Sequence, residues 1–247
     1  MGGAAALLGR QRTLALVALA AALAAYYFAV DSIPRISLWW EVALLGAGLL
    51  PAVFLFDLLV LPLARARGLL FVAAGLGVLA LLAELGDLEV LANFAKLGAV
   101  TFFGFWFLGF FEDLILIVVV ALIVPWIDAY SVWRGPTGHI VEHHSQIFTY
   151  FSFEFSLPHE RNDPRLGLPD LLFFALFLAA AARFRLRPGW TWVGMIAALA
   201  ATIAIDVWTD VGGLPALPAL SIGFLLPNAD LIGARLRRAS RPDVSGV

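Results

Sequence analysis

The sequence predicts an all-α, polytopic transmembrane helical bundle of about eight spans, and composition, hydropathy and run length support this prediction. Of the 247 residues, 62% are hydrophobic and 14% are charged, whereas soluble domains have about 45–50% apolar and about 25% charged residues. The mean hydropathy is +0.93. The apolar residues form runs close to the ~20 residues that a membrane-spanning helix needs.

Eight apolar runs are expected to be spans, at residues 13–30, 38–63, 69–85, 90–111, 114–133, 168–184, 190–208 and 214–233. Glu112 and Asp113 divide the 90–133 stretch, which is too long for one crossing. Pro51 lies inside the long second run, so we expect a kink or a tilt there. The chain then divides into N-terminal transmembrane helices (1–111), a catalytic-type core with two Asp-bearing helices (112–233) and a basic tail (234–247).

Clusters of arginine set the expected orientation. They flank the first, second, sixth and eighth runs: Arg10, Arg12, Arg65, Arg67, Arg183, Arg185, Arg187, Arg235, Arg237, Arg238 and Arg241. With eight spans all of them fall on one side, which the positive-inside rule makes the cytoplasmic side. We therefore expect a multi-pass protein of the cell (cytoplasmic) membrane with both termini in the cytoplasm. The alternative for 13–30 is a cleaved signal peptide, whose apolar core is usually ~7–15 residues.

Two aspartates lie in apolar surroundings. Asp128 is inside the fifth run and Asp170 begins the sixth. A carboxylate in the bilayer centre costs at least ~2.5–3.5 kcal/mol, so an intramembrane acid is a candidate functional residue. Asp128 is expected about 8 Å below the outer surface at 1.5 Å per residue, and Asp170 lies at a similar depth. The alternatives for Asp128 are a carboxylate hydrogen-bonded to a neighbouring helix or one that snorkels to the interface, and the alternative for Asp170 is an interfacial helix cap.

Two carboxylates at one depth can act as an acid–base pair. Close carboxylates do not both ionise readily, so they share a proton. The ionised one activates water while the protonated one polarises a carbonyl, which is what peptide hydrolysis needs. Asp170 begins its helix, where the helix dipole favours an anion. We therefore expect Asp170 to act as the base and Asp128 as the acid.

Three short motifs, taken together, resemble those of the presenilin and signal peptide peptidase family of intramembrane aspartyl proteases, and the pattern is closest to the prokaryotic presenilin homologues. The first motif is Ile127-Asp128 with its continuation Ala129–Trp133, which is similar to the archaeal members. The second is Gly167-Leu168-Pro169-Asp170, and the third is Pro215-Ala216-Leu217 followed by Pro218. The resemblance covers about residues 90–233.

The resemblance implies an intramembrane aspartic endopeptidase that needs no cofactor and cleaves transmembrane-helix peptides within the lipid bilayer. It makes Asp128 and Asp170 the catalytic residues. It also implies substrate binding by Gly167, Leu168, Pro169, Pro215, Ala216, Leu217 and Pro218. No nucleic-acid-binding motif is present, and the sequence does not indicate an oligomeric state.

This chain departs from the family pattern at three points. Ile127 replaces the usual tyrosine, and Pro169 replaces the glycine immediately before the second aspartate. Proline fixes φ and removes an N–H, although it suits the first position of a helix. The family has nine spans, whereas eight are expected here. A catalytically inactive relative with the same fold therefore stays an alternative.

The polar 134–167 loop contains a strand pattern. Residues Phe151–Leu157 alternate between apolar and polar side chains, which predicts a short strand or hairpin. Such a strand can pair with an extended substrate through its backbone, so Phe153 and Phe155 are candidate substrate-binding residues. The alternative is a hairpin that only covers the helix ends.

Two rival functions come from other residues. His139, Glu142 and His143 form an H-x-x-E-H pattern, which is typical of one class of zinc metalloprotease and would make this a zinc-dependent membrane hydrolase. Asp57 in the second run adds a third membrane acid, as in a proton-coupled transporter, unless it pairs with Arg65, Arg67 or Lys96. Cysteine is absent, which excludes disulfides and thiol catalysis.

Overall fold

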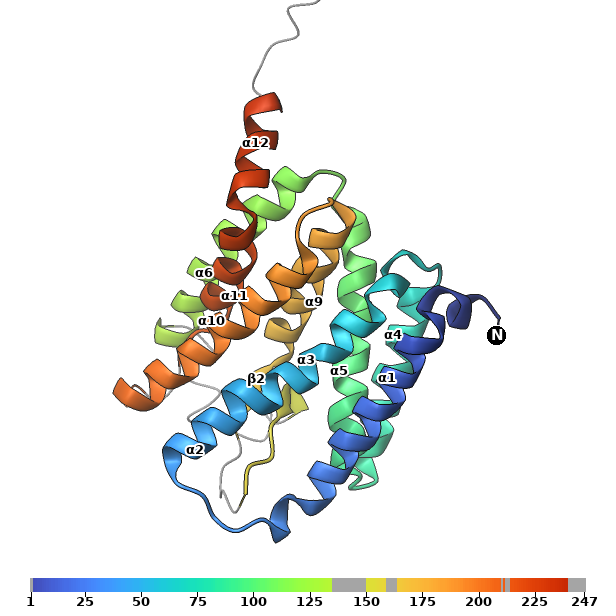
Figure 1. Ribbon diagram of the computed structural model, residues 1–247, viewed down its shortest axis with the longest axis vertical. Coiled ribbons are helices and arrows are strands. Elements are labelled where there is room, and N and C mark those ends of the chain that lie inside the picture. The colour runs from blue at the N-terminus through green and yellow to red at the C-terminus, as the bar shows by residue number, and fades with distance from the viewer. Residues whose placement is uncertain (1, 135–149, 159–163, 210, 212–213, 240–247) are drawn as a thin grey trace, which may run out of the picture.

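The computed structural model describes residues 2–134, 150–158, 164–209, 211 and 214–239 (Figure 1). Each of the eight expected apolar runs contains a helix. The α-helices are α1 (Gly2–Ala29), α2 (Leu38–Ala43), α3 (Leu50–Val60), α4 (Leu69–Leu85), α5 (Glu89–Phe107), α6 (Leu114–Arg134), α9 (Leu168–Arg183), α10 (Pro188–Thr209), α11 (Leu217–Leu225) and α12 (Ala229–Ala239). Short 3₁₀ turns, η1 (Val30–Ser32), η3 (Leu61–Arg65), η4 (Leu108–Phe110) and η5 (Leu226–Asn228), follow α1, α3, α5 and α11.

Six helical segments in the described part of the chain are long and apolar enough to cross a membrane. They are Gly9–Ser32, Leu38–Arg65, Glu89–Phe110, Leu114–Ser131, Pro188–Thr209 and Leu217–Arg237. The expected α-helical bundle and membrane character are therefore confirmed. The remaining two expected spans correspond to α4, of 17 residues, and α9, of 16 residues.

The second apolar run contains a widened turn rather than a simple proline kink. Residues Leu44–Leu49 form a π-helical stretch, η2, between α2 and α3. Pro51 lies in the first turn of α3, where it has no N–H to complete the preceding α-helical ladder. The chain therefore passes from α2 to α3 through i→i+5 hydrogen bonding.

Helix α9 forms the centre of the bundle. Residues 174–181 are at most 1% exposed, and α9 contacts α3, α5, α6, α10 and α11 (Figure 1). Gly104 of α5 permits one of these contacts, because a Cβ there would lie 3.1 Å from the carbonyl oxygen of Leu172. The helix that carries Asp170 is thus surrounded by protein along residues 174–181.

Helices α10 and α11 touch at their backbones. A Cβ added to Gly223 would lie 2.5 Å from the backbone nitrogen of Met195, and one added to Gly194 would lie 2.6 Å from the carbonyl oxygen of Gly223. Small residues allow this close packing between membrane helices. The contact fixes α11, and with it the Pro-Ala-Leu segment, against α10.

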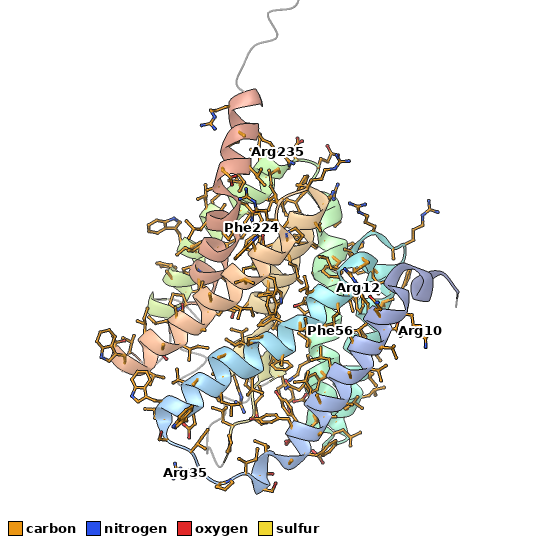
Figure 2. The ribbon with its side chains drawn as sticks, in the orientation of Figure 1. Arg10, Arg12, Arg35, Phe56, Phe224 and Arg235 are labelled. Carbon is orange, nitrogen blue, oxygen red and sulfur yellow. The ribbon has the colours of Figure 1, made fainter. Side chains whose placement is uncertain are left out.

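A buried amide joins α10 to the end of α11. Asn228 is fully buried; its Nδ2 donates to Thr191 Oγ1 (2.8 Å) and its Oδ1 accepts from the N–H of Arg187 (3.0 Å). In Figure 2, Arg235 of the following helix lies at the opposite end of the molecule from Arg35.

The expected hairpin is present. Strands β1 (Ser152–Glu154) and β2 (Arg165–Gly167) pair antiparallel, with Phe153 opposite Leu166. The alternating 151–157 segment predicted the first strand, and the second strand is its partner. β2 leads directly into α9, so the hairpin lies at the end of the bundle where Asp170 begins its helix (Figure 1).

The alternative in which Asp57 pairs with Arg65, Arg67 or Lys96 is not found among the described residues. Asp57 accepts a 2.6 Å hydrogen bond from Thr101 Oγ1 on α5, and Lys96 instead lies 3.6 Å from Glu84. Thr101 is one α5 residue that sequence reasoning passed over, because a threonine hydroxyl gives no charge signal in an apolar run.

Candidate active site

Asp128 lies on the last turns of α6, where its carboxylate meets the start of α11. The backbone N–H of Leu217 donates to Asp128 Oδ2 at 3.0 Å. Leu217 is the first residue of α11, and the first N–H groups of a helix have no partner within it. Pro218, the next residue, has no N–H. The N–H of Leu217 is therefore the only one that the first two residues of α11 offer. The Pro-Ala-Leu segment thus contacts the first aspartate through its backbone.

Asp170 lies in the first turn of α9 and folds back on the glycine before the helix. The backbone N–H of Gly167 donates to the Asp170 carboxylate. A Cβ at Gly167 would lie 3.2 Å from Asp170 Oδ2, so a larger residue would crowd this oxygen. The φ of Gly167 is −61°, which any residue adopts. The glycine is therefore needed for space rather than for backbone freedom.

Pro169 fits the position that it occupies. It lies in the first turn of α9, where an N–H would have no helical partner, and its ring is exposed. The glycine that the family pattern would place here would gain no hydrogen bond within the helix. The substitution therefore leaves the start of α9 and the position of Asp170 intact.

The structure brings the three predicted motifs together. α11 contacts both α6 and α9, and the negative charge of Asp128 acts on the Asp170 carboxyl. Both carboxylates are half-buried. We refer to this pair as the dyad. Each member accepts one backbone N–H, from Leu217 or from Gly167.

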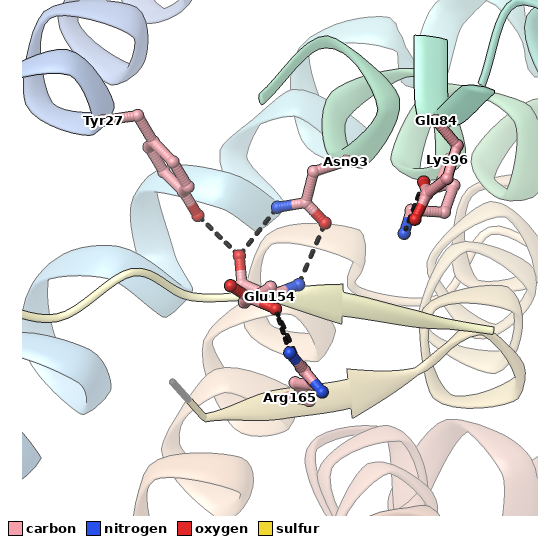
Figure 3. A network of polar contacts seen from close by, with 6 residues as sticks. All are labelled: Tyr27, Glu84, Asn93, Lys96, Glu154 and Arg165. Carbon is pink, nitrogen blue, oxygen red and sulfur yellow. Dashed lines mark hydrogen bonds and ion pairs between the residues drawn. The ribbon is translucent and has the colours of Figure 1, made fainter. Parts of the chain in front are cut away.

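Side chains from α1 and α5 hold the hairpin in place, and Figure 3 shows Tyr27 and Asn93 bonded to Glu154. The side-chain amide of Asn93 pairs with both backbone groups of Glu154 on β1: Nδ2 donates to the carbonyl at 2.7 Å, and Oδ1 accepts from the N–H at 2.9 Å. Tyr27 donates to the same carbonyl at 2.8 Å, and Tyr26 donates to the carbonyl of Ser156 at 2.9 Å. Asn93 thus takes the place of a neighbouring strand at this edge of β1.

Sequence reasoning did not single out Asn93, Tyr26 or Tyr27. A signal was present, because Asn93 is an amide inside an apolar run and the two tyrosines end the first run. Their partner is the backbone of a loop about 60 to 130 positions away, and a backbone partner leaves no pattern in the sequence.

The expected substrate-binding residues fall into two groups. Those beside the dyad lie at the starts of α9 and α11: Gly167, Leu168, Pro169, Pro215, Ala216, Leu217 and Pro218. Phe153 and Phe155 have side chains that are 0% and 2% exposed, and Phe153 packs edge-on against Phe94. These two phenylalanines hold the hairpin in the core, and the backbone around them pairs with β2.

The H-x-x-E-H pattern of His139, Glu142 and His143 lies outside the described residues. Within the residues that the structure describes, no group of three or more His, Cys, Asp or Glu side chains is arranged to hold a metal ion.

No family model, no curated protein and no solved structure matches this chain.

Proposed function

We propose that this chain is an intramembrane aspartyl protease that hydrolyses peptide bonds of transmembrane helices with Asp128 and Asp170. The observation that carries the proposal is the hydrogen bond from Leu217 to Asp128. It places the Pro-Ala-Leu segment on one member of the dyad while the charge of that member acts on the other. Two carboxylates from separate helices of a membrane bundle have no evident structural need to meet, since keeping two acids close in an apolar setting is unfavourable.

The proposed reaction is acid–base hydrolysis. The ionised carboxylate takes a proton from water as the water oxygen attacks the peptide carbonyl carbon, and the protonated carboxyl gives its proton to the carbonyl oxygen. The tetrahedral diol then collapses: the ionised carboxylate takes the proton of one diol hydroxyl as the carbonyl re-forms, the C–N bond breaks, and the protonated carboxyl gives its proton to the leaving nitrogen, so the dyad again holds one proton. The backbone hydrogen bonds do not distinguish the base from the acid, because each carboxylate accepts one. The pair is best treated as a unit that holds one proton.

The hairpin supports the proposal because a helical peptide bond is shielded from attack and must first be extended. An extended substrate can join the edge of a sheet through backbone hydrogen bonds. Asn93 and Tyr27 already bind the backbone of β1 at Glu154, which directs an added strand to the β2 side. β2 ends at Gly167, three residues before Asp170, so a strand there would lie next to the dyad.

We also propose that both termini lie in the cytoplasm of the cell membrane, with the hairpin and the dyad toward the outer side. The arginine clusters flank the ends of α1, α3, α9 and α12 that this orientation places inside, as the positive-inside rule requires. A protease arranged this way would act on helices in the outer half of the bilayer.

A cleavage assay tests the proposal. The purified protein in liposomes is given a fluorogenic transmembrane peptide, and wild type is compared with Asp128→Asn, Asp170→Asn and the control Asp113→Asn, an exposed residue in the loop before α6. We expect each dyad change to lower the rate by about 10²–10⁴-fold or more, with the control unchanged.

A second arm separates the zinc-hydrolase alternative. Cleavage that a chelator abolishes, and that His143→Ala removes while Asp170→Asn leaves it intact, would overturn the aspartyl mechanism. A wild-type protein that cleaves none of a panel of transmembrane peptides would favour the inactive relative.

A further inference from the structure

A cavity of about 830 Å³ lies between α1 and the start of α5. Residues from 16–28 of α1 and from 87–97 at the start of α5 line it, with Phe56 of α3. The segments that contain α1 and α5 are both long and apolar enough to cross a membrane. We propose that this cavity binds a phospholipid of the surrounding bilayer, with an acyl chain between the two helices and an amine-bearing headgroup at the start of α5. The inference does not depend on the protease proposal.

The cavity has the length of an acyl-chain site. Its α1 wall runs from Leu16 to Phe28, which is about 18 Å at 1.5 Å per residue. This length is close to the depth of one leaflet, since the hydrocarbon core of a bilayer is about 30 Å thick. The volume is within the ~300–1,000 Å³ of small-molecule sites, which suits a lipid chain better than a helix about 10–12 Å across.

The surface of the cavity is also that of a lipid site. Every lining residue from α1 and α3 is leucine, alanine or phenylalanine. Protein interiors contain few voids of this size, and water does not fill an apolar one. Phe28 and Leu91 of the lining are 81% and 45% exposed, so the cavity opens at the surface of the bundle. Inside a membrane, the molecules at that surface are lipids.

Two carboxylates at the start of α5 select the headgroup. Asp87 and Glu89 belong to the lining, and both are exposed. Within the described residues neither of them forms an ion pair, and no lysine or arginine lines the cavity. Lys96, farther along α5, lies 3.6 Å from Glu84. An ammonium group has three donors for such carboxylates, whereas an anionic headgroup is repelled by them. The lining therefore favours phosphatidylethanolamine over phosphatidylglycerol.

Phe94 connects the cavity to the hairpin. It lines the cavity, and its ring packs edge-on against Tyr27 and Phe153, with centroids 5.1 and 5.7 Å away. Tyr27 also donates to the carbonyl of Glu154 on the same strand as Phe153. A chain in the cavity thus supports a ring against which β1 packs. Hydrogen exchange at residues 152–154 of wild type should be slower with phosphatidylethanolamine bound than in the delipidated protein.

A lipid competition tests the site. The purified protein in detergent is equilibrated with equal amounts of phosphatidylethanolamine, phosphatidylcholine and phosphatidylglycerol with identical acyl chains, and bound lipid is counted by native mass spectrometry. Wild type should retain phosphatidylethanolamine roughly two- to tenfold more than phosphatidylglycerol, as two exposed ion pairs allow. Ala20→Phe, which puts a ring into the cavity lining, should lower lipid retention by about tenfold. The control Ala22→Phe, exposed on the same helix but outside the lining, should retain lipid as wild type does.

A double variant separates the headgroup from the chain. Asp87→Asn with Glu89→Gln should keep the bound lipid but lose the preference for phosphatidylethanolamine. Asparagine tolerates the positive φ of 55° at Asp87, so the turn is kept. The control pair Glu112→Gln with Asp113→Asn, exposed and outside the lining, should keep the preference. A preference unchanged by the first pair would overturn the headgroup assignment. Equal lipid retention by wild type and Ala20→Phe would overturn the site, as would dimers that Ala20→Phe dissociates, which would show that a second copy covers it.

Discussion

The backbone N–H of Leu217 donates a 3.0 Å hydrogen bond to Oδ2 of Asp128, 89 positions earlier in the chain. This contact gives Asp128 two separable roles. As an acceptor it satisfies the first N–H of α11, as a helix-capping side chain does. As a carboxylate it belongs to the proposed dyad. Substitutions can remove the second role while keeping the first.

Asp128→Asn should abolish cleavage without a comparable loss of stability, because its amide oxygen can still accept the N–H of Leu217. Asp128→Ala should lose activity and also destabilise the protein by about 0.5–2 kcal/mol, the usual cost of losing a helix cap. Thermal unfolding in mild detergent, run beside the cleavage assay, measures both effects. Equal stability of the two variants would mean that the hydrogen bond contributes nothing to holding α11.

Gly167→Ala should lower activity about 10–100-fold, because its Cβ would lie 3.2 Å from Asp170 Oδ2 and would displace the carboxylate. Small displacements of a reacting group are costly to rate. The backbone at Gly167 suits alanine, so the unfolding temperature should change little. The control is Gly189→Ala at the start of α10, where a Cβ meets nothing within 4 Å. Full activity in Gly167→Ala would exclude crowding as the reason for this glycine.

Pro169→Gly should not raise activity. Pro169 lies in the first turn of α9 with its ring exposed, and glycine there would add only freedom to the unfolded chain, at a cost of roughly 0.4–1 kcal/mol. The variant Pro169→Ala also lacks the proline ring but does not introduce glycine, so comparing its activity with that of Pro169→Gly shows which of the two changes matters. A cleavage rate that rises tenfold or more in Pro169→Gly would contradict this and would identify the proline as an inhibitory feature of an otherwise inactive relative.

The sequence predicted much of the fold because hydropathy determines where helices lie in a membrane protein. The expected 114–133 and 168–184 spans appear as Leu114–Arg134 and Leu168–Arg183. The last expected span, 214–233, was less accurate: α11 begins at Leu217 and residues 214–216 are not helical. Pro215 and Pro218 account for the late start of the helix, because neither has an N–H to donate. This late start leaves the N–H of Leu217 free of the helix, and it donates to Asp128.

Contacts between side chains and the backbone could not be predicted from the sequence. The residues of the dyad could be named because aspartate is unusual in an apolar run. Asn93 binds the backbone of Glu154, and any residue at position 154 would offer the same groups. The central burial of α9 was equally hidden, since its composition resembles that of a helix that faces lipid.

Asn93→Ala should loosen the hairpin. It removes two hydrogen bonds to the backbone of Glu154 and leaves that N–H without its partner, at a cost of about 1–3 kcal/mol. Tyr27→Phe removes a single bond to a carbonyl that Asn93 still binds, so about 0.5–1.5 kcal/mol is expected. Hydrogen exchange at residues 152–154 should rise most in Asn93→Ala, and cleavage should fall with it. Unchanged exchange would mean that the buried phenylalanines alone hold the hairpin.

The buried carboxyl of Asp57 separates the protease proposal from a proton-coupled transporter. Asp57 is 1% exposed, its Oδ1 accepts from Thr101, and its Oδ2 has no hydrogen-bond partner among the described residues. Thr101→Val should destabilise the protein by about 1–3 kcal/mol, because it leaves a buried acid with no donor. The double variant Asp57→Leu, Thr101→Val should recover most of that loss, since replacing both members of a buried polar pair by apolar groups is often nearly neutral. Unfolding of the two single variants, the double variant and wild type in detergent gives the coupling energy.

If Asp57 is structural, the double variant should also cleave peptide at close to the wild-type rate. A stable double variant that has lost its activity, or an uptake activity in liposomes that Asp57→Leu abolishes, would instead make Asp57 a functional membrane acid.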